Sequence, residues 1–96
     1  MKRDAILAIL RNHRSDLASK GVRSVFLFGS VARDEAALES DVDLLVDFDR
    51  PIGLFDFIGL QQHLERVLGC RVDLVPKDGI KPLLRQSILE GAIPVA

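Results

Sequence analysis

Asp41 and Asp43 form the pair whose spacing most directly indicates chemistry in this chain. They stand two positions apart in an apolar segment. Because alternate residues of a strand point to the same face, the two carboxylates are expected to project side by side. Carboxylates that close repel one another unless a cation lies between them. Mg²⁺ prefers oxygen ligands and accepts substrate phosphates, so the spacing predicts a metal site.

Gly29 and Ser30 precede this pair and add the features of a phosphate site. Ten residues separate Ser30 from Asp41, and the apolar run 25–28 leads directly into the glycine. Glycine lets a phosphate approach the backbone closely, and Ser30 adds a hydroxyl at an expected helix start, where free N–H groups favour anions. The combination predicts transfer of a nucleotide group. The alternative is a turn and a strand whose acids face solvent, and four such positions recur by chance on the order of once per thousand chains.

Segments with strand-like and helical patterns alternate along the chain and must position these residues. Apolar residues at helical spacing predict helices, the second of them short, at 3–19, 30–36, 54–68 and 81–90. Apolar runs bounded by turn residues predict three main strands at 22–28, 41–48 and 71–75. The apolar tail 92–96 can add a short edge strand. This order predicts an α/β fold, a small mixed β-sheet packed by about four helices.

Length and composition narrow the class of protein. The 96 residues are expected to form a single domain, residues 1–96. No apolar run approaches the length of a membrane span, and the single cysteine, Cys70, cannot form an internal disulfide. The net charge of −1 and the absence of Trp and Tyr disfavour a long nucleic acid as partner, because nucleic acids usually require a basic face. A cytoplasmic protein is the simplest interpretation.

Asp73 is a third acid, placed inside the expected strand 71–75. Its neighbours Val72 and Leu74 are expected to point into the core, which leaves Asp73 on the opposite face. If this strand pairs beside 41–48, Asp73 completes a triad with the first two acids. Three carboxylates can hold two metal ions and activate an attacking hydroxyl. The alternative is an edge-strand acid that faces water or pairs with Arg71.

Other charged residues near the strand ends are weaker candidates. Asp47 shares the strand parity of Asp41 and Asp43, but a further step along the strand puts it about 13 Å from Asp43. We therefore expect Asp47 at the solvated rim. Lys77 and Lys81 follow the third strand and could reach phosphates, although a solvated loop is the simpler expectation.

Residues 29–36 (GSVARDEA) and 40–46 (SDVDLLV) resemble the minimal nucleotidyltransferases, the MNT proteins. These belong to the superfamily of DNA polymerase beta and kanamycin nucleotidyltransferase. The resemblance extends over nearly the whole chain and implies a palm-like nucleotidyltransferase fold. One departure is Asp34, because many relatives have glycine at that position; aspartate tolerates turn conformations better than most residues.

The resemblance also implies roles for individual residues. Asp41, Asp43 and Asp73 would be the catalytic and metal-binding acids, holding two Mg²⁺ ions, and Asp73 would help to deprotonate the acceptor hydroxyl. Gly29 and Ser30 would bind the triphosphate of ATP. Arg33 matches a recurrent arginine of the family and would contact phosphate or acceptor.

The implied function is transfer of AMP from ATP to a hydroxyl of a partner protein. Minimal members often act beside a separate helical HEPN protein, so this chain would be the antitoxin that adenylylates a tyrosine of a HEPN ribonuclease toxin. A second hypothesis is a binding module that neutralises the HEPN partner by occlusion, with weak or lost transferase activity. A third is a small-molecule or RNA nucleotidyltransferase completed by a second chain. A homo-oligomer also stays open.

Overall fold

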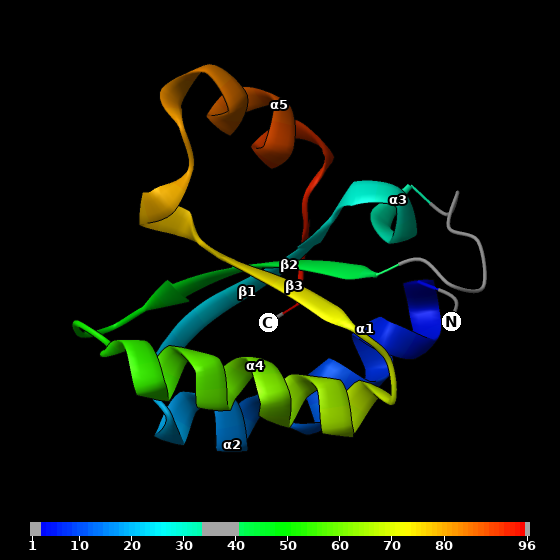
Figure 1. Ribbon diagram of the computed structural model, residues 1–96. Coiled ribbons are helices and arrows are strands. Elements are labelled where there is room, and N and C mark those ends of the chain that lie inside the picture. The colour runs from blue at the N-terminus through cyan, green and yellow to red at the C-terminus, as the bar shows by residue number, and fades with distance from the viewer. Residues whose placement is uncertain (1–2, 34–40, 96) are drawn as a thin grey trace.

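A computed structural model describes residues 3–33 and 41–95 and shows a four-stranded sheet (Figure 1). The strands lie in the order β3-β2-β1-β4. β1 pairs antiparallel with β2 and β4, and β2 pairs parallel with β3, so the sheet is mixed. The strands are β1 Val22–Phe28, β2 Val42–Phe48, β3 Val72–Pro76 and β4 Ile93–Pro94. The expected mixed sheet with a short C-terminal edge strand is confirmed.

Five α-helices and one 3₁₀ turn accompany the sheet within the described ranges. They are α1 Arg3–Asn12, α2 Arg14–Ser19, α3 Gly29–Ala32, α4 Leu54–Leu68, η1 Lys77–Gly79 and α5 Pro82–Gly91. The expectation for 54–68 matches α4. The short helix expected at 30–36 begins one residue earlier and ends at Ala32. Residues 34–36, including Asp34, lie outside the described part of the chain.

The single helix expected at 3–19 is wrong, because the chain breaks at His13 into α1 and α2. His13 has φ −103° and ψ 12°, which is not helical. Its ring Nδ1 lies 2.8 Å from the carbonyl oxygen of Ile9, the oxygen that the His13 N–H would bond in a continuous helix. The N–H bonds the Leu10 oxygen instead, at 3.1 Å. A side chain that competes for a backbone acceptor in this way interrupts a helix.

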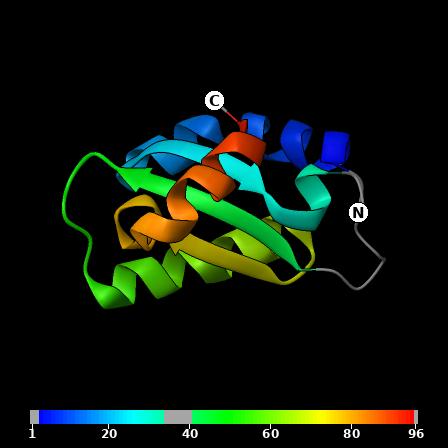
Figure 2. The same cartoon turned by 90° about the horizontal axis from the view of Figure 1, so that it is seen from above.

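The helices cover both faces of the sheet, with α1, α2 and α4 on one face and α3 and α5 on the other (Figures 1 and 2). The main core lies under α1 and α4, where Ile6, Leu10 and Leu64 are almost completely buried. Val42 and Leu44 of β2 belong to the same cluster. Because side chains alternate along a strand, burying these two turns Asp43 to the opposite face.

The position of β3 depends on α4. The side-chain amide of Gln61 donates to the carbonyl oxygen of Val72 at 3.0 Å, and the Val72 N–H donates to Glu65 Oε2 at 3.1 Å. Both backbone groups of Val72 are therefore satisfied by α4 rather than by another strand. These two bonds fix β3, and with it Asp73, against the helix layer.

Within residues 3–33 and 41–95, no helix combines the length and the hydropathy that a bilayer span requires.

Candidate active site

Asp43 and Asp73 lie at paired positions on the neighbouring parallel strands β2 and β3. Burial of Asp43, followed by the nearby charges of Asp73 and Asp41 and a hydrogen bond to Asp73, raises its pKa above the ordinary value. Arg33 opposes this effect. The expected pairing of the two strands is confirmed. The two carboxylates lie within hydrogen-bond reach of each other, and a cation between like charges this close would relieve their repulsion.

Gly29 joins β1 to α3 directly against this acid pair. It has a positive φ of 77°, a conformation that side chains disfavour. A Cβ built on Gly29 would overlap the carboxylate of Asp43. This contact follows from the β1–β2 register, in which Phe28 lies opposite Asp43. The glycine thus provides space for an acid as well as for a ligand, a role that the sequence pattern did not reveal.

α3 holds the remaining residues expected at the site. Val31 and Ala32 are buried and anchor the short helix to the core. Ser30 is half-buried in the first turn, and Arg33 follows the last residue of α3 with its side chain exposed. The positive charge of Arg33 partly offsets the rise in the pKa of Asp43. The structure therefore brings Gly29, Ser30 and Arg33 to the end of the sheet where the acids lie.

Asp41 precedes β2 and faces a different partner. Its Oδ1 lies 3.9 Å from Arg71 Nε, and the side chains of Asp41 and Arg71 are 49% and 86% exposed. An ion pair this exposed contributes about 0–1 kcal/mol. Arg71 was considered as a partner for Asp73, and the structure pairs it with Asp41 instead.

The three acids supply the right donors for Mg²⁺ without forming a closed cage. Among the described residues, no three acidic, His or Cys side chains converge closely enough to hold a metal together. Asp43 and Asp73 are adjacent, and Asp41 forms a weak ion pair with Arg71. Carboxylate oxygens are the ligands that Mg²⁺ prefers. The acids therefore fit the ion by donor type and by their place on one end of the sheet.

Two expectations for neighbouring charges are wrong. The carboxylate of Asp47 is not solvated: it accepts hydrogen bonds from Arg23 Nε and Nη2 at 3.0 and 2.7 Å, and its side chain is 13% exposed. Lys77 lies with its ammonium 5.6 Å from the ring centroid of Phe26 and is half-buried. Both residues stabilise the sheet and are not placed at the acid pair.

Comparisons with known proteins agree with this geometry. The family model described as "Nucleotidyltransferase domain" matches residues 10–95. The chain is 42% identical over 93 residues to the protein adenylyltransferase MntA of Thermococcus cleftensis, which covers 96% of this chain and 94% of the relative. A solved structure assigned as a minimal nucleotidyltransferase has a TM-score of 0.85 at 42% identity and covers 98% of this chain and 96% of that chain.

More distant solved structures share the fold. A chain from the complex of a tri-AMPylated Shewanella oneidensis HEPN toxin with an MNT antitoxin has a TM-score of 0.68 at 20% identity. The match covers 94% of this chain and 71% of that chain. A toxin–antitoxin structure with AMP-PNP gives a TM-score of 0.75 at 22% identity, covering 90% of this chain and 72% of that chain. The resemblance drawn from residues 29–36 and 40–46 is confirmed.

Proposed function

Because this chain belongs to the nucleotidyltransferase domain family, we propose that it transfers AMP from ATP to a hydroxyl of a partner protein with the help of Mg²⁺. The observation that carries the proposal is the pairing of Asp43 with Asp73 beside Gly29. Two carboxylates forced together beside a glycine turn have no use in a purely structural sheet, because their repulsion opposes folding. They gain a use when cations and phosphates occupy the space in front of them.

Each residue of the site has a defined task in this reaction. Asp41, Asp43 and Asp73 would hold Mg²⁺, which neutralises the phosphate charges and orients an in-line displacement. Gly29 and Ser30 bind the triphosphate with backbone N–H groups and a hydroxyl, and Arg33 adds a positive charge.

The proton and the leaving group can be followed through the transfer. The acceptor hydroxyl oxygen forms a bond to the α-phosphorus as the bond to pyrophosphate breaks. Asp73 is exposed on the strand, so its carboxylate is accessible to take the proton of the acceptor.

The acceptor protein in this proposal is a HEPN-type toxin, and the chain is its antitoxin. Support comes from the MntA relative, named a protein adenylyltransferase, and from fold neighbours solved as complexes of a HEPN toxin with an MNT antitoxin. A tyrosine hydroxyl is the acceptor that we favour. The open placement of Asp73 suits an acceptor that arrives on another molecule.

Neutralisation by occlusion is the second candidate. It is favoured by large apolar side chains that stay exposed on α4, where Leu54 is 70% and Phe55 is 88% exposed. Exposed apolar surface of this kind often marks a protein interface. In this case the acids would not be needed for neutralisation.

The deciding experiment incubates the chain with labelled ATP, Mg²⁺ and a purified HEPN protein. We expect label on the HEPN protein with the wild type and with the control Asp78→Asn, which changes an exposed acid of η1. We expect none with Asp43→Asn plus Asp73→Asn, although circular dichroism should show a folded protein. Undiminished transfer by the double variant would refute the proposed site. Lost transfer with intact neutralisation of the toxin would establish occlusion.

A further inference from the structure

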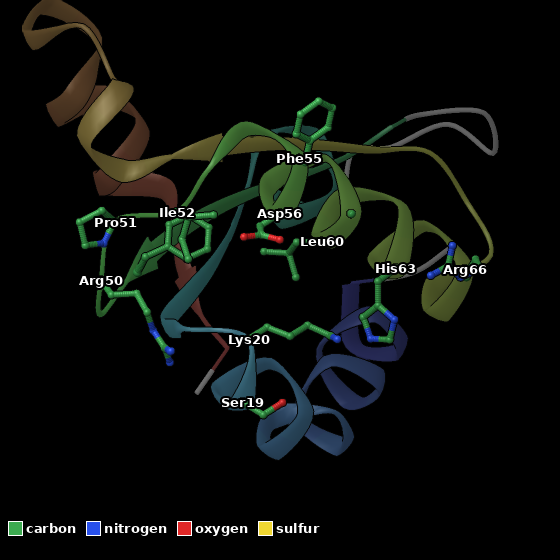
Figure 3. A pocket seen from close by; sticks show the side chains of 12 residues that line it. Ser19, Lys20, Arg50, Pro51, Ile52, Phe55, Asp56, Leu60, His63 and Arg66 are labelled. Carbon is green, nitrogen blue, oxygen red and sulfur yellow. The ribbon is translucent and has the colours of Figure 1, made fainter.

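A hollow between the end of α2 and α4 lies at the other end of β2 from the acid pair (Figure 3). We call it the α2–α4 hollow. Its volume is about 490 Å³, within the range of roughly 300–1,000 Å³ that is typical of small-molecule sites. It includes Phe48, the last residue of β2, whereas Asp43 lies near the first. The hollow is lined by Ser19, Lys20, Phe48, Arg50, Pro51, Ile52, Phe55, Asp56, Gly59, Leu60, His63 and Arg66.

Positive charge is concentrated in this hollow. Lys20, Arg50 and Arg66 line it with one carboxylate, Asp56, although the whole chain has a net charge of −1. Arg50 already binds Asp49 at 2.8 Å. Lys20 and Arg66 have no carboxylate within ion-pair distance among residues 3–33 and 41–95. Cations gathered around a concave surface attract an anion, because each gains from the same ligand charge.

His63 adds a polar group to the same wall. Its Nε2 lies 2.7 Å from Asp16 Oδ2, an ion-pair distance without the alignment of a hydrogen bond. In Figure 3 the side chains of Lys20 and His63 point toward one another, Lys20 from the end of α2 and His63 from α4. The two elements therefore present their polar atoms to one space.

Part of the hollow is apolar. Ile52 and Leu60 line it, and Asp56 and Leu60 point from α4 toward Lys20 (Figure 3). Gly59 stands in the middle of α4, where glycine costs roughly 0.5–1 kcal/mol relative to alanine. A Cβ on Gly59 would have no neighbour within 4 Å. Packing of the described residues therefore does not require this glycine, which leaves room for a planar group in the hollow.

We propose that the α2–α4 hollow is a second ligand site that binds a nucleoside monophosphate, apart from the catalytic site. Lys20 and Arg66 bind the phosphate. The ring lies against Ile52, Leu60 and the space that Gly59 leaves open. Asp56 accepts a hydrogen bond from an exocyclic amine of the base, which explains a carboxylate among three cations.

The test is a titration of the ¹⁵N-labelled chain with AMP, inorganic phosphate or adenosine in EDTA. Without divalent ions the acids at Asp43 and Asp73 repel phosphate, so the catalytic site is silent. We expect saturable amide shifts at Lys20, Ile52 and Gly59, and tighter binding of AMP than of phosphate or adenosine. Shifts confined to Gly29, no saturable shift, or AMP binding no tighter than phosphate would overturn the proposal.

Two double variants complete the test. Lys20→Gln with Arg66→Gln removes the unpaired cations, and both residues are exposed, so folding should be retained. We expect AMP to bind at least about tenfold more weakly. The matched control is Arg14→Gln with Arg85→Gln, which removes two exposed cations elsewhere and should leave the affinity unchanged. Equal affinity of both double variants would overturn the assignment of the phosphate contacts.

Discussion

Asp43 and Asp73 stand opposite each other on parallel strands, and Gly29 packs against the first of them. The fold holds these acids close enough for the charge of Asp73 to disfavour ionisation of Asp43. Such an arrangement opposes folding when no cation is bound, and it becomes favourable when a cation is present.

Replacing Asp43 by Asn should raise the melting temperature of the metal-free protein at neutral pH. The pKa of Asp43 is raised in the folded state, so ionisation destabilises the fold above its ordinary pKa of 3.8. The wild type should therefore lose stability relative to Asp43→Asn as pH rises from this value through the raised pKa, and the difference should vanish below 3.8. Thermal unfolding in EDTA across this pH range measures the effect. A wild type that gains stability over the same range would contradict the raised pKa.

Gly29→Ala should destabilise the protein by at least about 1–3 kcal/mol and abolish AMP transfer. The residue has a positive φ, which costs a side chain roughly this amount, and the new methyl group would also displace the Asp43 carboxylate. Chemical denaturation measures the loss. Gly59→Ala is the matched control, because its Cβ meets open space within a helix. It should stabilise the free protein by about 0.5–1 kcal/mol.

Arg71→Gln should increase the affinity for Mg²⁺ by about two- to fivefold. The guanidinium of Arg71 competes with Mg²⁺ for the carboxylate of Asp41, and solvent screening keeps this competition weak. The free energy of unfolding should change little, because the Arg71–Asp41 pair is exposed. Isothermal titration with Mg²⁺ checks the affinity. Weaker Mg²⁺ binding in the variant would show that Arg71 supports the site and does not compete with the ion.

Glu65→Ala should reduce the free energy of unfolding by about 1–2 kcal/mol, because it leaves the N–H of Val72 without its partner. The same change should loosen β3 and lower transfer activity through Asp73. Urea denaturation and amide exchange at Val72 provide the measurements. Gln62→Ala, an exposed neighbour on α4, is the control and should change stability by less than about 0.5 kcal/mol.

Much of the scaffold could be predicted from local pattern. The strand 22–28 and the helix 54–68 match β1 and α4, since an apolar run and a helical stripe each leave a clear signal. The break at His13 could not be predicted, because the apolar stripe continues across it and the cause is a ring nitrogen near the Ile9 oxygen. The periodicity of apolar residues carries no information about such a contact.

The candidate site could likewise be predicted only in part. The acids and the Gly29–Ser30 corner were marked by residue type and spacing, and the crossover through α4 made adjacent parallel strands the natural arrangement. The contact of Gly29 with Asp43 depends on strand register, and the Asp41–Arg71 pair depends on how two strand ends meet. The ion pair between Arg23 and Asp47 was missed for the same reason. Spacing along the chain does not determine these cross-strand distances.

The bonds from Gln61 and Glu65 to Val72 have an effect on assembly. They occupy backbone groups of β3 that could otherwise pair with a strand of another molecule. Pro76 ends the same edge of the sheet and has no backbone N–H to donate. Addition of a further strand to β3 is therefore hindered at Val72 and at Pro76.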